Sequence, residues 1–111
     1  MSELMLKTIY PLSDHLFYVE REAPKDEFEW LQLETRMFTL AEIGNLLRSP
    51  MRAYDDDQWM RDAQLLIDVA AKAYKSAQAR DLQSMIDLNA ELYESCQSCH
   101  VHYRPGYRRR L

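Results

Sequence analysis

Hydrophobic residues recur along the chain at spacings of three and four, which is the pattern of helices that each bury one face. Four amphipathic segments can be separated: one at about 3–20, one from about 26 to 48, one that follows the aspartates at 55–57 and ends at a break near 79–80, and one at about 82–103. No run of β-branched residues alternates with polar ones, so the pattern does not favour a sheet. Four helices with short connections predict an all-α fold, an antiparallel four-helix bundle in one domain over residues 1–111.

Residues that cap or break helices mark the boundaries of these segments. Pro11 interrupts the first segment and is expected to kink or divide its helix. Asp26 and Glu29 have the spacing of a capping box. The other expected boundaries are Ser2 as the first N-cap, the pair Ser49 and Pro50 as the end of the second helix, Asp55, Asp56 and Asp57 as N-caps of the third, a break near Ala79 and Arg80, Asp81 as the last N-cap, and Pro105 with Gly106 as the last stop.

The inward-facing positions of the predicted helices can be read from the same spacing. Gly44 lies on the inner face of the second helix, where glycine costs about 1 kcal/mol of helix stability relative to alanine. It therefore indicates a close approach, usually by another helix and alternatively by a flat ligand. The inner face of the last helix is predicted to contain Leu82, Met85, Ile86, Asn89, Leu92, Tyr93, Cys96, Cys99, His100 and Tyr103.

The charge of the chain is unevenly distributed. The net charge is −4 at pH 7, yet the segment from Cys96 to Leu111 carries four arginines and no acidic residue. The acidic remainder argues against nucleic-acid binding, whereas the basic end can steer an acidic protein partner. No apolar run is long enough to span a membrane.

The motif with the clearest chemistry is Cys96-Gln97-Ser98-Cys99-His100, the C-x-x-C-H signature of c-type haem attachment. Thiols three residues apart lie on one side of a helical turn, where each can form a thioether with one vinyl group of the porphyrin. The imidazole of His100 follows directly and can bind the iron from one face. Aromatic walls for the haem are expected from Trp30, Trp59, Tyr93 and Tyr103.

Two other interpretations of the cysteines were weighed. A zinc site could use Cys96, Cys99, His100 and His102, but structural zinc sites usually take ligand pairs from two separated segments. A disulfide or thiol redox pair is the other alternative, although a thioredoxin-type motif is expected in a βαβ setting. Haem attachment is the preferred interpretation.

At this point the chain resembles the class II c-type cytochromes, the cytochrome c-prime and cytochrome c556 group. The resemblance is tightest at CQSCHVHYR, residues 96–104, and is looser over EWLQLETRMFTLAEIGNLL and DDDQWMRDAQLLIDVAAKA. It implies a four-helix bundle with covalent haem c near the C-terminal end of the last helix. Cys96 and Cys99 would hold the haem, and His100 would be the proximal iron ligand.

The resemblance also implies that the first helix covers the opposite face of the haem. In c556-like members an early methionine binds the iron, and Met5 is the matching candidate in this chain. In c-prime members an apolar residue blocks that position and the iron stays five-coordinate. His15 is a weaker candidate ligand, His102 is expected to be exposed, and Arg104 and Arg52 are candidate partners of the haem propionates.

The predicted function is electron transfer by a mono-haem cytochrome with His100 and Met5 as axial ligands, working with a redox partner protein. The alternative is a five-coordinate protein that binds NO or CO. No nucleophile with an adjacent base and no carboxylate pair is evident, so enzyme activity is not predicted. The N-terminus lacks a signal-peptide pattern. Haem attachment nonetheless implies an exported, periplasmic protein whose targeting segment lies outside this sequence. An exposed amphipathic face can also support a homodimer.

Overall fold

In this computed structural model the described residues are 2–50, 53 and 57–103, and they form helices joined by loops, with no strand among them. The expected all-helical bundle is confirmed for this part of the chain. The helical elements are α1 (Ser2–Leu4), the π-helix η1 (Met5–Ile9), α2 (Tyr10–Phe17), α3 (Glu27–Leu47), α4 (Gln58–Gln78), α5 (Leu82–Asp87) and α6 (Asn89–Tyr103).

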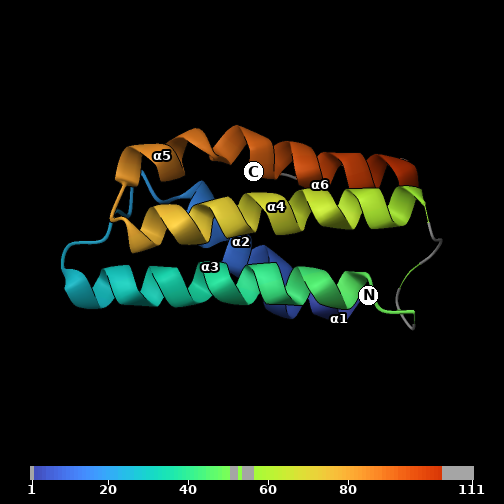
Figure 1. Cartoon of the computed structure of the whole chain (residues 1–111), viewed down its shortest axis with the longest axis horizontal. Coiled ribbons are helices and arrows are strands. Elements are labelled where there is room, and N and C mark those ends of the chain that lie inside the picture. Colours follow the sequence, from blue (N-terminus) through green and yellow to red (C-terminus); the bar gives the residue numbers. More distant parts are fainter. Residues whose placement is uncertain (1, 51–52, 54–56, 104–111) are drawn as a thin grey trace.

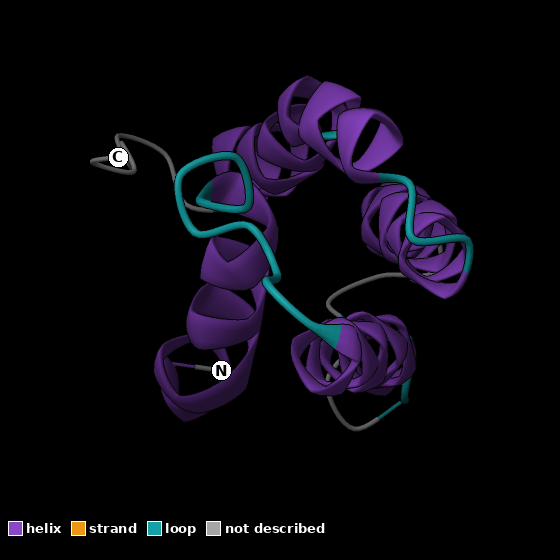
Figure 2. Cartoon of the chain, turned by 90° about the vertical axis from the view of Figure 1, so that its left-hand side faces the viewer, coloured by secondary structure: helices purple, strands orange, loops and turns teal. Residues whose placement is uncertain are grey.

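The helices pack into an elongated bundle of 41 × 26 × 22 Å. The long helices α3 and α4 lie side by side along its long axis, and α6 packs against α4 (Figure 1). The N-terminal stretch from α1 to α2 packs on α3 and also reaches α5 and α6, which closes the bundle on its remaining side (Figure 2). In this arrangement α4 packs against both α3 and α6.

The first predicted helix is interrupted near Pro11, as expected, and the interruption includes a π-helical segment. Residues Met5–Ile9 form a π-helix, in which the N–H of Tyr10 donates to the carbonyl oxygen of Met5, five residues back. Pro11 has no N–H to donate and stands in the first turn of α2, directly after the change from π to α geometry. The α-helical part then ends at Phe17, three residues before the predicted end at Glu20.

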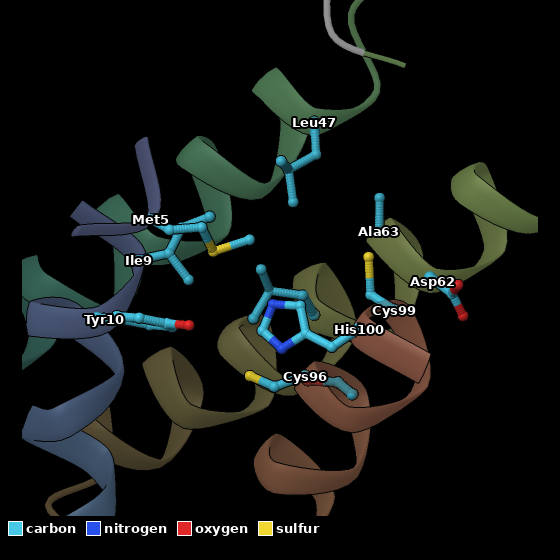
Figure 3. A pocket seen from close by; sticks show the side chains of 11 residues that line it. Met5, Ile9, Tyr10, Leu47, Asp62, Ala63, Cys96, Cys99 and His100 are labelled. Carbon is cyan, nitrogen blue, oxygen red and sulfur yellow. The ribbon is translucent and has the colours of Figure 1, made fainter. Parts of the chain in front are cut away.

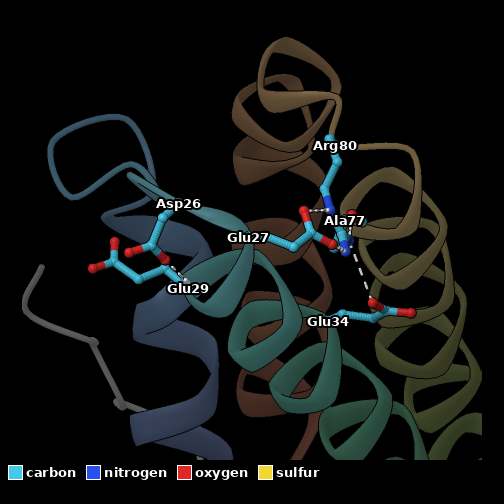
Figure 4. A network of polar contacts seen from close by, with 6 residues as sticks. All are labelled: Asp26, Glu27, Glu29, Glu34, Ala77 and Arg80. Carbon is cyan, nitrogen blue, oxygen red and sulfur yellow. Dashed lines mark hydrogen bonds and ion pairs between the residues drawn. The ribbon is translucent and has the colours of Figure 1, made fainter.

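The capping box at the start of α3 is confirmed. The Asp26 carboxylate accepts a hydrogen bond from the Glu29 N–H at 2.8 Å, and the two side chains are shown in Figure 4. The Glu29 carboxylate in turn accepts from the Lys25 N–H at 2.8 Å, one residue earlier than in the usual reciprocal box. These two bonds provide acceptors for backbone N–H groups in the first turn of α3 and in the preceding loop, which have no partner within the helix.

The cap at the start of α4 differs from the prediction. Asp57 occupies the N-cap position, but its carboxylate makes no capping hydrogen bond and pairs with Arg61 at 3.0 Å. Asp55 and Asp56 lie outside the described residues. At the start of α5, Asp81 caps as predicted, because its carboxylate accepts from the Ser84 N–H at 3.1 Å.

The last predicted helix is not continuous, since Leu88 separates α5 from α6. The Asn89 side-chain amide donates to the Ile86 carbonyl oxygen at 3.0 Å. A side chain that bonds a nearby carbonyl competes with the helical ladder, which explains the interruption. One predicted inner position of this segment is wrong, because Tyr93 is exposed, and one buried position, Ser95, was not predicted.

Gly44 marks the close approach of α3 and α4. A Cβ atom built on Gly44 would lie 2.7 Å from Cγ1 of Ile67 on α4, closer than real Cβ contacts allow. Of the two explanations offered for this glycine, helix packing accounts for it. The neighbouring small residues Ala63, Ala70, Ala73 and Ala77 of α4 are also buried.

A polar network joins the start of α3 to the end of α4 (Figure 4). The Arg80 guanidinium pairs with both carboxylate oxygens of Glu27, with Glu34 at 3.3 Å, and with the Ala77 carbonyl oxygen at 2.6 Å. Arg80 also has a φ of 55°, a left-handed conformation that is costly for a residue with a Cβ. The ion pairs around its side chain help to hold it there.

We expect Gly44→Ala to destabilise the protein. The steric conflict with Ile67 should cost more than the roughly 1 kcal/mol gained in helix propensity, giving a net loss of about 1–2 kcal/mol in urea unfolding. In an Ile67→Ala background the same change should become neutral or stabilising. Asn45→Ala, at an exposed neighbouring position, has no such steric conflict and should stabilise the protein slightly, by up to about 0.7 kcal/mol of helix propensity. A stabilising effect of Gly44→Ala in the otherwise unchanged chain would contradict this packing account.

The Arg80 network predicts a pH-dependent contribution to stability. The hydrogen bond from Arg80 lowers the pKa of Glu27 below its ordinary value of 4.5. The stabilisation is therefore present above pH 4.5 and is lost as the pH falls through the lower folded-state pKa. Glu27→Gln should lower the melting temperature by a few degrees at most at pH 7, and the difference should disappear in acid. Glu3→Gln, which removes an exposed carboxylate at the other end of the bundle, is the control variant.

Candidate functional site

A hollow of about 360 Å³, counting its open mouth, lies between the N-terminal stretch, the end of α3, the start of α4 and the end of α6. The enclosed part of this space is only about 20 Å³, well below the roughly 300–1,000 Å³ of small-molecule sites, so a large group would enter only with movement of the lining side chains. Its lining is largely apolar and consists of Met5, Ile9, Tyr10, Leu47, Asp62, Ala63, Leu66, Ser95, Cys96, Cys99 and His100 (Figure 3).

All three reactive residues of the C-x-x-C-H motif line this hollow. Cys96, Cys99 and His100 lie on one side of α6, and the imidazole of His100 projects into the middle of the view in Figure 3. His100 is buried, with 4% of its surface exposed, whereas the two cysteines are half-buried thiols with no disulfide between them. The motif therefore presents its donors to a sheltered space rather than to the outer surface.

Met5 faces the motif from the other end of the chain. It lies on the π-helix η1, and its sulfur points into the hollow toward His100 in Figure 3. Ile9 and Tyr10 line the hollow beside it. Two thiols, an imidazole and a thioether thus surround one space, and this donor set matches the covalent and axial ligands of a c-type haem.

A buried carboxylate behind the motif was missed by the sequence prediction. Asp62 on α4 is 1% exposed and lines the hollow. It accepts hydrogen bonds from the Gln58 amide at 3.1 Å and from the Ser98 hydroxyl at 2.7 Å. Its second oxygen lies 2.9 Å from Nδ1 of His102. The available signal was that Asp62 falls three residues after Trp59, on the apolar stripe of its helix.

The position of His102 bears on the zinc alternative. Its side chain is 42% exposed, as expected, but Nδ1 is directed at Asp62 rather than at the cysteines. Within residues 2–50, 53 and 57–103, no three histidine, cysteine, aspartate or glutamate side chains are arranged to hold a metal ion. The geometry therefore gives no support to a four-ligand zinc site.

The environment of Cys99 bears on the redox alternative. Burial, followed by the negative charges of Asp62 and Cys96, raises the pKa of the Cys99 thiol to about 12. Thiol–disulfide exchange needs the thiolate, and reactive redox cysteines have lowered pKa values. At neutral pH Cys99 remains a thiol, which disfavours a dithiol redox centre.

The other predicted contributors are placed elsewhere or not described. Arg52 and Arg104 lie outside the described residues. His15 lines a separate cavity between α2 and α3 with Glu22 and Arg36, so the structure does not bring it to Met5. Burial, followed by the charge of Arg36, lowers the pKa of His15 despite the opposing charges of Asp14 and Glu22.

The expected aromatic walls are not those observed. Trp30, Trp59 and Tyr93 do not line the hollow. Trp59 instead donates its indole N–H to the Leu47 carbonyl oxygen, which joins the start of α4 to the end of α3. Tyr10 is the aromatic residue that does line the hollow. The side chain of Tyr103 is not among the described parts of the structure.

The raised pKa of Cys99 predicts slow alkylation of this thiol. In the full chain without haem, labelling of Cys99 by iodoacetamide should keep rising with pH beyond pH 10, because the thiolate is scarce below a pKa of about 12. Peptide mass spectrometry at a series of pH values gives the rate for each cysteine separately. A rate that levels off near pH 9, as for an ordinary thiol, would contradict the burial described above.

No family model matches the chain, and neither the search of curated proteins nor the search of solved structures found a match. Among the described helices, none combines the length and the apolar character required to cross a bilayer.

Proposed function

We propose that this protein is a mono-haem c-type cytochrome that transfers single electrons. Cys96 and Cys99 would hold the haem covalently, and His100 and Met5 would be the axial ligands. One observation carries the proposal: the side chains of the C-x-x-C-H motif and the thioether of Met5, from opposite ends of the chain, face one sheltered hollow.

Each residue of the site would have a distinct role. The two thiols would fix the group to α6, while His100 and Met5 would hold the iron from opposite sides. The haem, when bound, supplies one-electron chemistry between ferric and ferrous iron, and methionine ligation raises its potential. The apolar side chains of Ile9, Leu47 and Leu66 would exclude water from the site, which also tunes the potential.

The bundle topology forms part of the same proposal. An antiparallel four-helix bundle, with the haem near the C-terminal end of the last helix, is what the resemblance to class II cytochromes implies. The path of the chain in Figure 1 supports it, because α4 returns along α3 after the loop that joins them. The hollow lies at the end of the bundle where α6 finishes.

The proposed partners follow from surface features. A redox partner protein with an acidic surface would meet the arginine-rich C-terminal end, which lies outside the described residues. A homodimer is favoured by the outer face of α3, where Phe28, Leu31, Phe38 and Leu46 are exposed by 46–68%. Covalent haem attachment would make this an exported, periplasmic protein.

Absorption spectroscopy tests the proposal on protein produced together with a haem-attachment system. We expect covalently bound haem, a ferric methionine–iron charge-transfer band and little spectral change when CO is added to the ferrous form. Met5→Ala should abolish the band, lower the midpoint potential and make CO binding rapid. These effects follow from the loss of the sixth ligand.

Two controls sharpen this test. Met60→Leu alters a half-buried methionine that does not line the hollow, so its spectra should match the unaltered protein. The double change Cys96→Ala and Cys99→Ala should allow denaturant and acid to extract any haem. A high-spin protein that binds CO at once before any substitution would favour the gas-binding alternative. Absence of covalent haem would refute both.

A further inference from the structure

A polar cluster on α4 and α6 lies directly behind the cysteine motif. The Asp62 carboxylate is completely buried, with 0% of its side chain exposed. One of its oxygens accepts from Ser98 at 2.7 Å and from Gln58 at 3.1 Å, and the other contacts Nδ1 of His102 at 2.9 Å. Asp62 therefore links α4 to two successive turns of α6.

The residues of α6 divide between two directions around the helix axis. Ser98 and His102 are four residues apart, so they lie one above the other and both reach Asp62. Cys96, Cys99 and His100 project from the adjoining side of α6 into the hollow, and Asp62 lies at the α4 edge of the same hollow. Because neighbouring residues differ by about 100° around a helix, a small rotation of α6 would break the contacts to Asp62 and turn the thiols away together.

The energetic reason for a fixed rotation is the burial of the carboxylate. An ionised carboxylate only accepts hydrogen bonds, and a buried one that loses its donors has a large desolvation penalty. Rotation of α6 would remove the Ser98 and His102 contacts while leaving Asp62 buried on α4. The final turn of a helix also lacks backbone partners for its carbonyl groups, so side-chain anchoring has most effect there.

We propose that Asp62 is a positioning residue that fixes the rotation of α6, so that Cys96, Cys99 and His100 face the hollow before haem is attached. Asp62 acts through Ser98 and His102 and forms no bond to the haem. The part of this inference that concerns haem attachment rests on the proposed function. The part that concerns the rotation of α6 rests on the hydrogen bonds alone.

Amide hydrogen exchange on the full chain tests the rotation directly. Asp62→Ala should speed exchange in residues 98–103 by roughly tenfold, because the side-chain bonds that hold the last turns of α6 to α4 are lost. Exchange at Met37 and Leu40, in the centre of α3, should be unchanged. Asp87→Asn is the matched control, because it removes an exposed carboxylate from α5.

Two further variants separate positioning from a general loss of stability. Asp62→Asn should restore slow exchange, because the amide oxygen can accept from Ser98 and Gln58 and the amide nitrogen can donate to His102. Ser98→Ala alone should speed exchange in residues 98–103 by less than Asp62→Ala does. Added to Asp62→Ala, it should cause little further increase, because both changes remove the same hydrogen bond. Exchange in residues 98–103 that is unchanged in Asp62→Ala, or accelerated equally in α3, would overturn the inference.

The fraction of protein with covalent haem, measured by intact mass after production with a haem-attachment system, tests the functional consequence. We expect a several-fold loss in Asp62→Ala and near-normal attachment in Asp62→Asn and Asp87→Asn. Equal attachment in all variants would overturn the role in positioning for attachment. If the unaltered chain itself carries no haem, the proposed function fails, and the exchange experiment still decides whether Asp62 fixes α6.

Discussion

The close approach of α3 and α4 at Gly44 is the contact on which the rest of the bundle depends. The missing side chain lets α4 come against α3 at Ile67. With α4 held in this position, its other side becomes the surface on which α6 packs. The same helix thus shares a core with α3 and presents Asp62 to α6.

Helix boundaries could be predicted from the sequence where a single residue controls the local backbone. The Asp26 and Asp81 carboxylates cap as expected because a capping bond spans only three residues. Asp57 is also an aspartate at an N-cap position, but its carboxylate pairs with Arg61. The break at Leu88 could not be predicted, because it depends on which partner the Asn89 amide selects. Local signals therefore identify the candidates for capping, while competition between partners decides which are used.

The residues of the candidate site could likewise be predicted only in part. Cys96, Cys99 and His100 could be identified because their spacing lies within one helical turn, and Met5 could be proposed only through the family resemblance. Asp62 was missed because its partners Ser98 and His102 lie 36 and 40 residues further along the chain. A periodic pattern reports which face of a helix is buried, and it does not report which residue of another helix lies opposite. The polar support of the motif is a property of the α4–α6 pair, so it required the structure.

The π-turn at the N-terminus explains how Met5 and its neighbours share one wall. In a regular α-helix, residues five apart differ by about 140° around the axis, so Met5 and Tyr10 would face different directions. The hydrogen bond from the Tyr10 N–H to the Met5 carbonyl oxygen widens the turn and brings these two residues into line. Both then line the hollow, together with Ile9. Because Pro11 has no N–H to sustain the α-helical pattern, the residue that was expected only to bend this helix also favours the wider turn that directs Met5 toward His100.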